Sequence, residues 1–265
     1  MPKLASFQFR TRRGWACLGT VFGAGLLLGA AIPLPPLTGL PWIVALPEHG
    51  KVQDRVTLPL GATERRPIVV AVHGAGDRPD WACGGWRLGV ESYAFVVCPM
   101  GLPMGHDRYG WGNTQSIAAA TERALAQVKT RFASYLDDGP MIYAGFSQGA
   151  MLADKFLVEH AAQFPVAVLA EGGYEFLKGA AFARKYHDAG GRRLMILCGT
   201  AGCMATAKRA KVTAEREGLE VIVSGDPTAG HNLNKPMQDA IQRDWQKLVA
   251  GLAGWASYSA HRWTH

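Results

Sequence analysis

Short runs of apolar and β-branched residues recur along the chain, and each ends at a cluster of small or polar residues. The run at residues 68–72 is the plainest, with five consecutive apolar side chains. Continuous runs of this length are typical of strands that a parallel sheet buries on both faces. We expect strands at residues 42–46, 52–60, 68–72, 94–98, 141–144, 166–170, 193–198 and 220–223.

Longer amphipathic stretches separate these runs and predict helices. They lie at residues 114–136, 174–187, 204–217 and 235–252, with another helix directly after residue 147. Strands that alternate with helices indicate an α/β fold, in which a mostly parallel sheet is covered by helices on both faces. Reactive groups in such sheets gather where the strands end. The residues that follow each strand are therefore the first candidates for chemistry.

Ser147 follows one predicted strand, in the sequence Gly145-Phe146-Ser147-Gln148-Gly149. A G-x-S-x-G sequence between a strand and a helix is typical of a nucleophilic serine on a sharp turn. The two glycines remove side chains that would collide with neighbouring backbone in such a turn. The same letters also occur by chance in surface turns, but the strand and helix on either side favour a nucleophile.

A serine hydroxyl is a weak nucleophile near neutral pH, so it needs a positioned base. Of the eight histidines, His231 and His73 fall in glycine-flanked loops after predicted strands. His231 comes between the last strand and the last helix, which places it at the same sheet edge as Ser147. We expect His231 to act as general base and then as general acid, and His73 to orient its own loop.

Attack on a carbonyl group creates an oxyanion, which needs preorganised N–H donors. The first donor that we expect is the backbone N–H of Gln148, directly after the nucleophile. The second should come from the loop that contains Gly74 and Ala75, with Ala75 the first choice, because flanking glycines let backbone approach a substrate. This loop lacks a G-x-G-x-x-G sequence, so a nucleotide-binding turn is not indicated.

Three motifs in this order, HGAGD at 73–77, GFSQGAMLA at 145–153 and AGH at 229–231, resemble those of the α/β-hydrolase superfamily. The closest fit is the phospholipase/carboxylesterase (acyl-thioesterase-like) branch, with some likeness to secreted polyester-depolymerase and feruloyl-esterase-like enzymes. The likeness extends over about residues 68–252. It implies the α/β-hydrolase fold and hydrolysis of a carboxylic ester or thioester through an acyl-serine intermediate, without metal or cofactor.

The sequence departs from this family at the acid of the triad. The family carries its acid in a turn after the strand that ends here at Cys198, typically as G-x-x-D, and this chain has Gly202 where the aspartate is expected. Glu171, at the end of the preceding strand, is our first substitute. Asp226 is the second and Asp77 the third. The missing aspartate also leaves open a different class of function, a catalytically impaired binding or scaffold protein of the cell envelope.

The segment 99–113 leaves a strand at the same edge and is rich in large side chains. We expect Tyr109, Trp111 and Met104 of this segment, together with Trp81, to line an apolar pocket for an acyl or aryl group of a small-molecule ester. The alternative is that these side chains pack in the protein interior.

The amino terminus is basic as far as Arg13, apolar and glycine-rich over 15–28, and small at 29–31. This is the layout of a signal peptide cleaved near Ala31, although the apolar run approaches the length of an uncleaved membrane anchor. We therefore expect a leader at 1–31, one α/β-hydrolase domain at 32–254 and a tail at 255–265. The protein would be periplasmic or extracellular, and would touch a membrane only through an uncleaved leader.

Charge and cysteine content follow from this leader. The formal net charge of the 265 residues is +7, but four of the 28 basic residues lie in the first thirteen, and without them it is about +3. Nucleic-acid binding is therefore not indicated. Beyond the leader, Cys83–Cys98 and Cys198–Cys203 are the first disulfide pairings to expect in an oxidising compartment. The sequence allows three connectivities, and four free thiols remain the alternative for a cytosolic protein.

Overall fold

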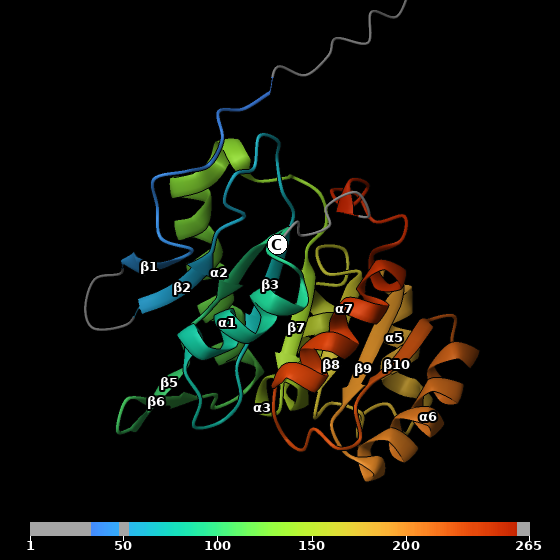
Figure 1. Cartoon of the computed structure of the whole chain (residues 1–265). Helices are drawn as coiled ribbons and strands as arrows, with labels where there is room; N and C mark the ends of the chain where they lie inside the picture. Colours follow the sequence, from blue (N-terminus) through green and yellow to red (C-terminus); the bar gives the residue numbers. More distant parts are fainter. Residues whose placement is uncertain (1–32, 48–52, 259–265) are drawn as a thin grey trace, which may run out of the picture. The chain divides into compact units, whose positions relative to one another are not determined.

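The computed structural model describes residues 33–47 and 53–258, which belong to one compact unit. The expected leader lies outside these residues. An eight-stranded sheet forms the centre, in the order β1-β2-β4-β3-β7-β8-β9-β10 (Figure 1). The strands are β1 (Ile43–Pro47), β2 (Gln53–Thr57), β3 (Ile68–Val72), β4 (Phe95–Cys98), β7 (Ile142–Phe146), β8 (Val166–Ala170), β9 (Arg193–Cys198) and β10 (Glu220–Gly225).

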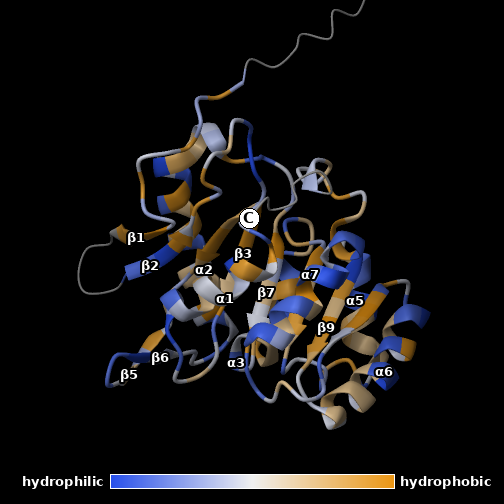
Figure 2. Cartoon of the chain, viewed as in Figure 1, coloured by the Kyte–Doolittle hydropathy of each residue, from blue (hydrophilic) through white to orange (hydrophobic). Residues whose placement is uncertain are grey.

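The sheet is parallel from β4 to β10, and β1 and β2 add an antiparallel edge. Alternate residues of β3 enter two separate cores, Val70 and Val72 on one face and Val69 and Ala71 on the other. Figure 2 shows hydrophobic central strands, with hydrophilic residues on the helices around them. The predicted α/β fold with a mostly parallel sheet is thus confirmed.

Helices cover both faces of the sheet. The first face packs against α2 (Thr114–Phe132), α4 (Ala153–Glu159), α5 (Ala180–Asp188) and α6 (Ala201–Arg216). The second packs against α1 (Pro79–Gly89) and α7 (Lys235–Val249), which lie in front of the strands in Figure 1. No helix among residues 33–47 and 53–258 is long and apolar enough to cross a membrane.

Several elements differ from the sequence prediction. The helix after Ser147 is two helices, α3 (Gln148–Met151) and α4, and the residue between them, Leu152, accepts a hydrogen bond from the Thr114 hydroxyl. Helix α1 was not predicted. The segment 99–113, where no strand was predicted, contains a short hairpin of β5 (Leu102–Gly105) and β6 (Arg108–Gly110).

Two disulfides tie helices to the sheet. Cys83–Cys98 joins α1 to the end of β4, with Cα atoms 5.8 Å apart. Cys198–Cys203 joins the end of β9 to the first turn of α6, with Cα atoms 5.5 Å apart. Both pairings are the ones expected from the sequence. At the carboxyl end of the described chain, Trp255 and Tyr258 are buried and pack against Tyr93.

Candidate active site

Ser147 lies on a strained turn between β7 and α3. Its backbone has φ 51° and ψ −115°, a region that side-chain-bearing residues rarely adopt. A Cβ atom on Gly149 would lie 2.3 Å from the carbonyl oxygen of Val72, and one on Gly145 would lie 2.7 Å from the carbonyl oxygen of Gly149. Both glycines of the G-x-S-x-G sequence are therefore required by close backbone packing.

The imidazole of His231 lies between Ser147 and Glu171. Its Nε2 is 3.0 Å from Ser147 Oγ, and its Nδ1 is 3.2 Å from Glu171 Oε2. The carboxylate accepts a hydrogen bond from Nδ1–H, so Nε2 carries no proton and can take the proton of the serine hydroxyl. The Phe146 ring packs against the imidazole, with ring centroids 5.1 Å apart. The structure thus brings a hydroxyl, an imidazole and a carboxylate together in the order that serine nucleophiles use.

Glu171 occupies the position after β8 and also has a left-handed backbone, with φ 52°. Its side chain is 5% exposed, and Oε1 accepts a hydrogen bond from the backbone N–H of Gly199. A hydrogen-bond donor of this kind stabilises the charged form of a buried carboxylate, which has lost its hydration. The negative charge is therefore held in place, with Oε2 directed to the histidine.

The other two candidate acids are engaged elsewhere. Asp226 accepts hydrogen bonds from the hydroxyl and the backbone N–H of Thr228, at 2.6 and 2.8 Å, and these bonds lower the pKa of its carboxyl group. Asp77 accepts the backbone N–H of Arg78. Both behave as turn residues. Glu171 is the carboxylate beside the imidazole.

His73 is a buried support for the loop that contains Gly74 and Ala75. Its Nδ1 donates to the Gly74 carbonyl at 2.7 Å, and its Nε2 accepts the N–H of Gly101 at 3.2 Å. Burial lowers its pKa, so the neutral ring is favoured. A Cβ atom on Gly74 would lie 3.2 Å from the Cβ of Ser147, so this loop runs directly beside Ser147. Ala75 is the exposed residue that follows.

Gln148, the residue after Ser147, is the first residue of α3, so its backbone N–H has no partner within the helix. Its side chain accepts from the Trp111 N–H at 2.8 Å and donates to the Trp111 carbonyl at 2.9 Å. The Trp111 ring is buried, with its Nε1 donating to the His73 carbonyl. Gln148 thereby fixes the segment 99–113 to the turn that carries Ser147.

The four expected substrate residues therefore differ in environment. Trp111 is interior, and the Tyr109 hydroxyl donates to Asp107 at 2.9 Å. Met104 is 59% exposed and Trp81 51% exposed, with the Arg108 guanidinium over the Trp81 ring. The sequence did not point to Met151, which lies one helical turn after Ser147. Its side chain is 56% exposed, and its backbone N–H donates to the Ser147 carbonyl.

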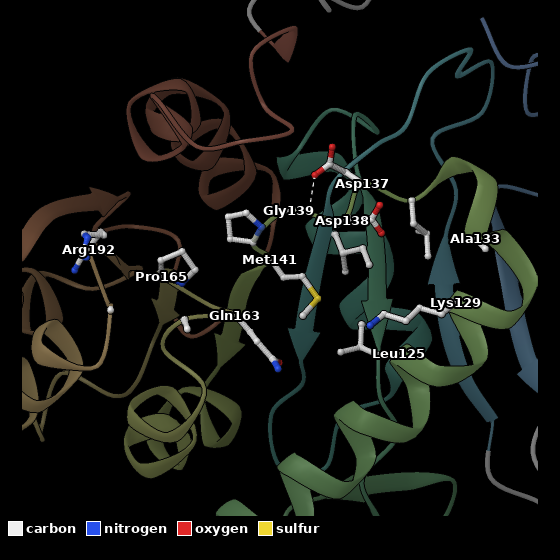
Figure 3. Close-up of a pocket in the computed structure, with 15 residues that line it drawn as sticks. Leu125, Lys129, Ala133, Asp137, Asp138, Gly139, Met141, Gln163, Pro165 and Arg192 are labelled. Atoms are coloured by element: carbon white, nitrogen blue, oxygen red, sulfur yellow. Dashed lines mark hydrogen bonds between the residues drawn. The ribbon is translucent and has the colours of Figure 1, made fainter. Parts of the chain in front are cut away.

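A separate hollow of about 950 Å³ lies at the opposite end of the strands (Figure 3). Its walls come from the amino ends of β3, β7, β8 and β9 and from the end of α2, and include Lys129, Met141 and Arg192. No serine, cysteine or histidine lines this hollow as the structure describes it. The Asp137 carboxylate accepts a hydrogen bond from the Gly139 N–H. The candidate chemistry is at the other edge of the sheet.

The sequence matches no family model and no curated protein. Solved structures do match. FphF, a fluorophosphonate-binding serine hydrolase of Staphylococcus aureus, is 14% identical with a TM-score of 0.57, over 78% of this chain and 98% of that one. Est1E of Butyrivibrio proteoclasticus, solved with ferulic acid bound, is 10% identical with a TM-score of 0.53, over 78% and 99%.

An uncharacterized protein of Bacillus cereus has a TM-score of 0.57 at 11% identity, and the match covers 71% of this chain and 61% of that one. At such identities the likeness concerns the fold. The sheet order, the strained serine turn after β7 and these neighbours agree, so the chain has the α/β-hydrolase fold that its motifs predicted.

Proposed function

We propose that the protein is a serine hydrolase that cleaves carboxylic esters through an acyl-serine intermediate. The observation that carries this proposal is the line of contacts from Ser147 Oγ through the His231 imidazole to Glu171. A hydroxyl on a strained turn has no structural need for an imidazole at 3.0 Å and a buried carboxylate behind it. Nucleophilic catalysis does need them.

In the proposed reaction, Ser147 Oγ attacks the ester carbonyl carbon while its proton passes to His231 Nε2. The oxyanion would be held by the backbone N–H groups of Gln148 and Ala75, with Gly74 letting the loop approach. The intermediate collapses, and the leaving alkoxide takes the proton from the imidazolium, which Glu171 stabilises. Water then attacks the acyl group by the same steps, and the acid and Ser147 are released.

The proposed substrate is a small ester with an apolar acyl or aryl group. Exposed Met104 and Met151 support this, because flexible thioether side chains suit apolar groups of varied shape. Trp81 and Tyr109 would form the outer part of the same surface, and Trp111 would support it from the interior. The ferulic acid in Est1E is consistent with an aromatic acyl group.

The alternative of an impaired scaffold protein arose from the missing aspartate at position 202. The contact between Glu171 and His231 supplies a carboxylate from a neighbouring strand instead. This favours an enzyme over a scaffold.

A panel of p-nitrophenyl esters of increasing acyl length, with matched thioesters, tests the proposal. We expect turnover of at least one ester, and a loss of about 10³-fold or more in kcat for Ser147→Ala. Folded wild-type protein that hydrolyses no member of the panel would contradict the proposal. Equal rates for the wild type and Ser147→Ala would do the same.

We propose further that residues 1–31 are a signal peptide and that the enzyme acts in the periplasm or outside the cell. Two disulfides support export, because such bonds persist in oxidising compartments. Amino-terminal sequencing of the protein recovered from its host tests this. A mature chain that begins near residue 32 is expected, and a membrane-bound chain with an intact leader would favour the anchor.

A further inference from the structure

Gly199 contacts both Glu171 and the residue that precedes His231. Its backbone N–H donates to Glu171 Oε1. Its carbonyl oxygen accepts the N–H of Gly230 at 2.8 Å, and Gly230 directly precedes His231. One peptide segment therefore holds the carboxylate on one side and the histidine loop on the other. Neither contact involves a side chain of the segment, so both depend on where its backbone lies.

The backbone around Gly199 has little space in which to move. A Cβ atom on Gly199 would lie 1.9 Å from the Gly230 carbonyl oxygen. A Cβ atom on Gly225 would lie 1.9 Å from the Cys198 carbonyl oxygen. Gly199 and Gly225 thus let three backbone segments pack directly on one another. A small shift of the Cys198–Gly199 backbone would consequently alter both hydrogen bonds.

A disulfide closes this segment into a small covalent loop. Cys198 is the last residue of β9, and Cys203 lies in the first turn of α6, where its N–H also bonds to the Thr200 hydroxyl at 3.2 Å. Both sulfurs and a Glu171 carboxylate oxygen lie within 4.8 Å of one another. The disulfide is therefore placed where it restricts the backbone that holds the carboxylate.

We propose that the Cys198–Cys203 disulfide is a positioning element for catalysis. By closing the loop, it fixes Gly199 so that the N–H directs Glu171 to His231 Nδ1 and the carbonyl holds the loop that carries His231. The loop at 199–203 lacks the aspartate that the resemblance predicted. It instead positions Glu171, the carboxylate that follows β8. This inference rests on the proposed ester hydrolysis.

The structure contains a matched control in Cys83–Cys98, which is also buried but ties α1 to β4. Within the described residues, its two cysteines make no hydrogen bond to Ser147, His231 or Glu171. Removing Cys198–Cys203 as Cys198→Ala/Cys203→Ala should lower kcat about 10- to 100-fold and change KM less than about threefold, since the acid acts on the chemical step. Cys83→Ala/Cys98→Ala should retain kcat within about threefold. Circular dichroism establishes that both variants are folded at the assay temperature.

If the alanine pair does not fold, Cys198→Val/Cys203→Ser restores buried volume without the bond, and the same result is expected. A double-mutant cycle separates positioning from general support of the fold. In a Glu171→Gln background, loss of the disulfide should lower kcat by a smaller factor than in the wild type, because the part of its effect that passes through the carboxylate is already missing and only the part that passes through the His231 loop remains.

Two outcomes would overturn the inference while ester hydrolysis stands. They are an unchanged kcat in the folded Cys198/Cys203 variant of an active enzyme, and a full additional loss in the Glu171→Gln background. Absence of turnover by the wild type, with no labelling of Ser147, would instead overturn the proposed function itself.

Discussion

Two residues with side chains adopt the left-handed backbone region at neighbouring strand ends. Strands β7 and β8 pair with Phe146 opposite Ala170, so the next residues, Ser147 and Glu171, emerge side by side. Their φ angles are 51° and 52°. Each such conformation costs about 1–3 kcal/mol and persists where surrounding structure enforces it. Here it turns a hydroxyl and a carboxylate toward the same imidazole.

Replacing the carboxylate tests its role at this scale. Glu171→Gln keeps the size of the side chain and removes its charge, so the imidazolium that forms during attack loses its stabilising partner. We expect kcat to fall by about 10²- to 10⁴-fold with a small change in KM. Asp226→Asn is the control. Its kcat should stay within about threefold of the wild type, because the Asp226 carboxylate accepts hydrogen bonds from Thr228 of its own turn. Comparable losses in the two variants would contradict the assignment of Glu171.

The buried imidazole of His73 predicts a pH dependence of stability. Burial lowers the pKa of His73 below its ordinary value of 6.5, so the unfolded chain binds a proton in a range where the folded chain does not. The contribution of His73 to stability is therefore complete above about pH 6.5 and is lost as the pH falls below it, with a slope of up to about 1.4 kcal/mol per pH unit.

Urea unfolding of the wild type and His73→Gln between pH 7.5 and 5 measures this contribution as a difference. The free energy of unfolding of the wild type should decline more steeply on acidification than that of the variant. Parallel curves would show that His73 titrates alike in the folded and unfolded chain.

At the scale of elements, strands that the sheet buries on both faces were predictable and exposed elements were not. Residues 68–72, 166–170 and 193–198 are strands with the expected bounds, because short apolar runs between turn residues are typical of strands buried on both faces. Helix α1 contains Gly84 and Gly85, which weaken its helical pattern. Strand β5 is exposed at every position, so burial imposes no pattern on its sequence.

The hairpin segment owes its position to Gln148, whose side chain makes two hydrogen bonds to the Trp111 backbone. Gln148→Ala removes these bonds and leaves the backbone N–H that would stabilise the oxyanion. We expect KM for an apolar ester to rise about 3- to 10-fold, with a smaller effect on kcat. Gln163→Ala, in the hollow at the opposite end of the sheet, is a control that should leave both constants unchanged. A large fall in kcat with constant KM would instead place the Gln148 side chain in the chemical step.

At the scale of the whole molecule, the site joins residues that lie 84 and 60 positions from His231 in the chain. Sequence motifs were sufficient to select Ser147 and His231 as candidates, because each follows a predicted strand between glycines. The sequence favoured Glu171 over Asp226 and Asp77 as the acid but could not exclude the other two, since any carboxylate that follows a strand can reach the same edge of the sheet. The contacts of Gly199 could not be predicted, because they depend on backbone packing among three separate segments.

Removing Cys83–Cys98 should cost more stability than removing Cys198–Cys203, but it should cost less activity. Cys83–Cys98 closes a loop with a sequence separation of 15 and Cys198–Cys203 one of 5. Loop entropy therefore predicts a loss of about 3 kcal/mol for removing the first and about 2 kcal/mol for the second. Denaturant unfolding of the two alanine pairs measures these losses. The Cys83/Cys98 variant should be the less stable of the two, and the Cys198/Cys203 variant should have the lower kcat. If the less stable variant were also the less active one, stability alone would account for the activity.

The central claim is that Ser147 is a nucleophile activated by His231. Labelling with a fluorophosphonate probe, followed by mass spectrometry of the peptide that contains residue 147, tests it most directly. The account predicts one covalent adduct on Ser147, none on Ser147→Ala, and labelling slowed by at least about 10²-fold in a folded His231→Ala variant. Labelling that persists in Ser147→Ala, or that proceeds at the wild-type rate without His231, would contradict it.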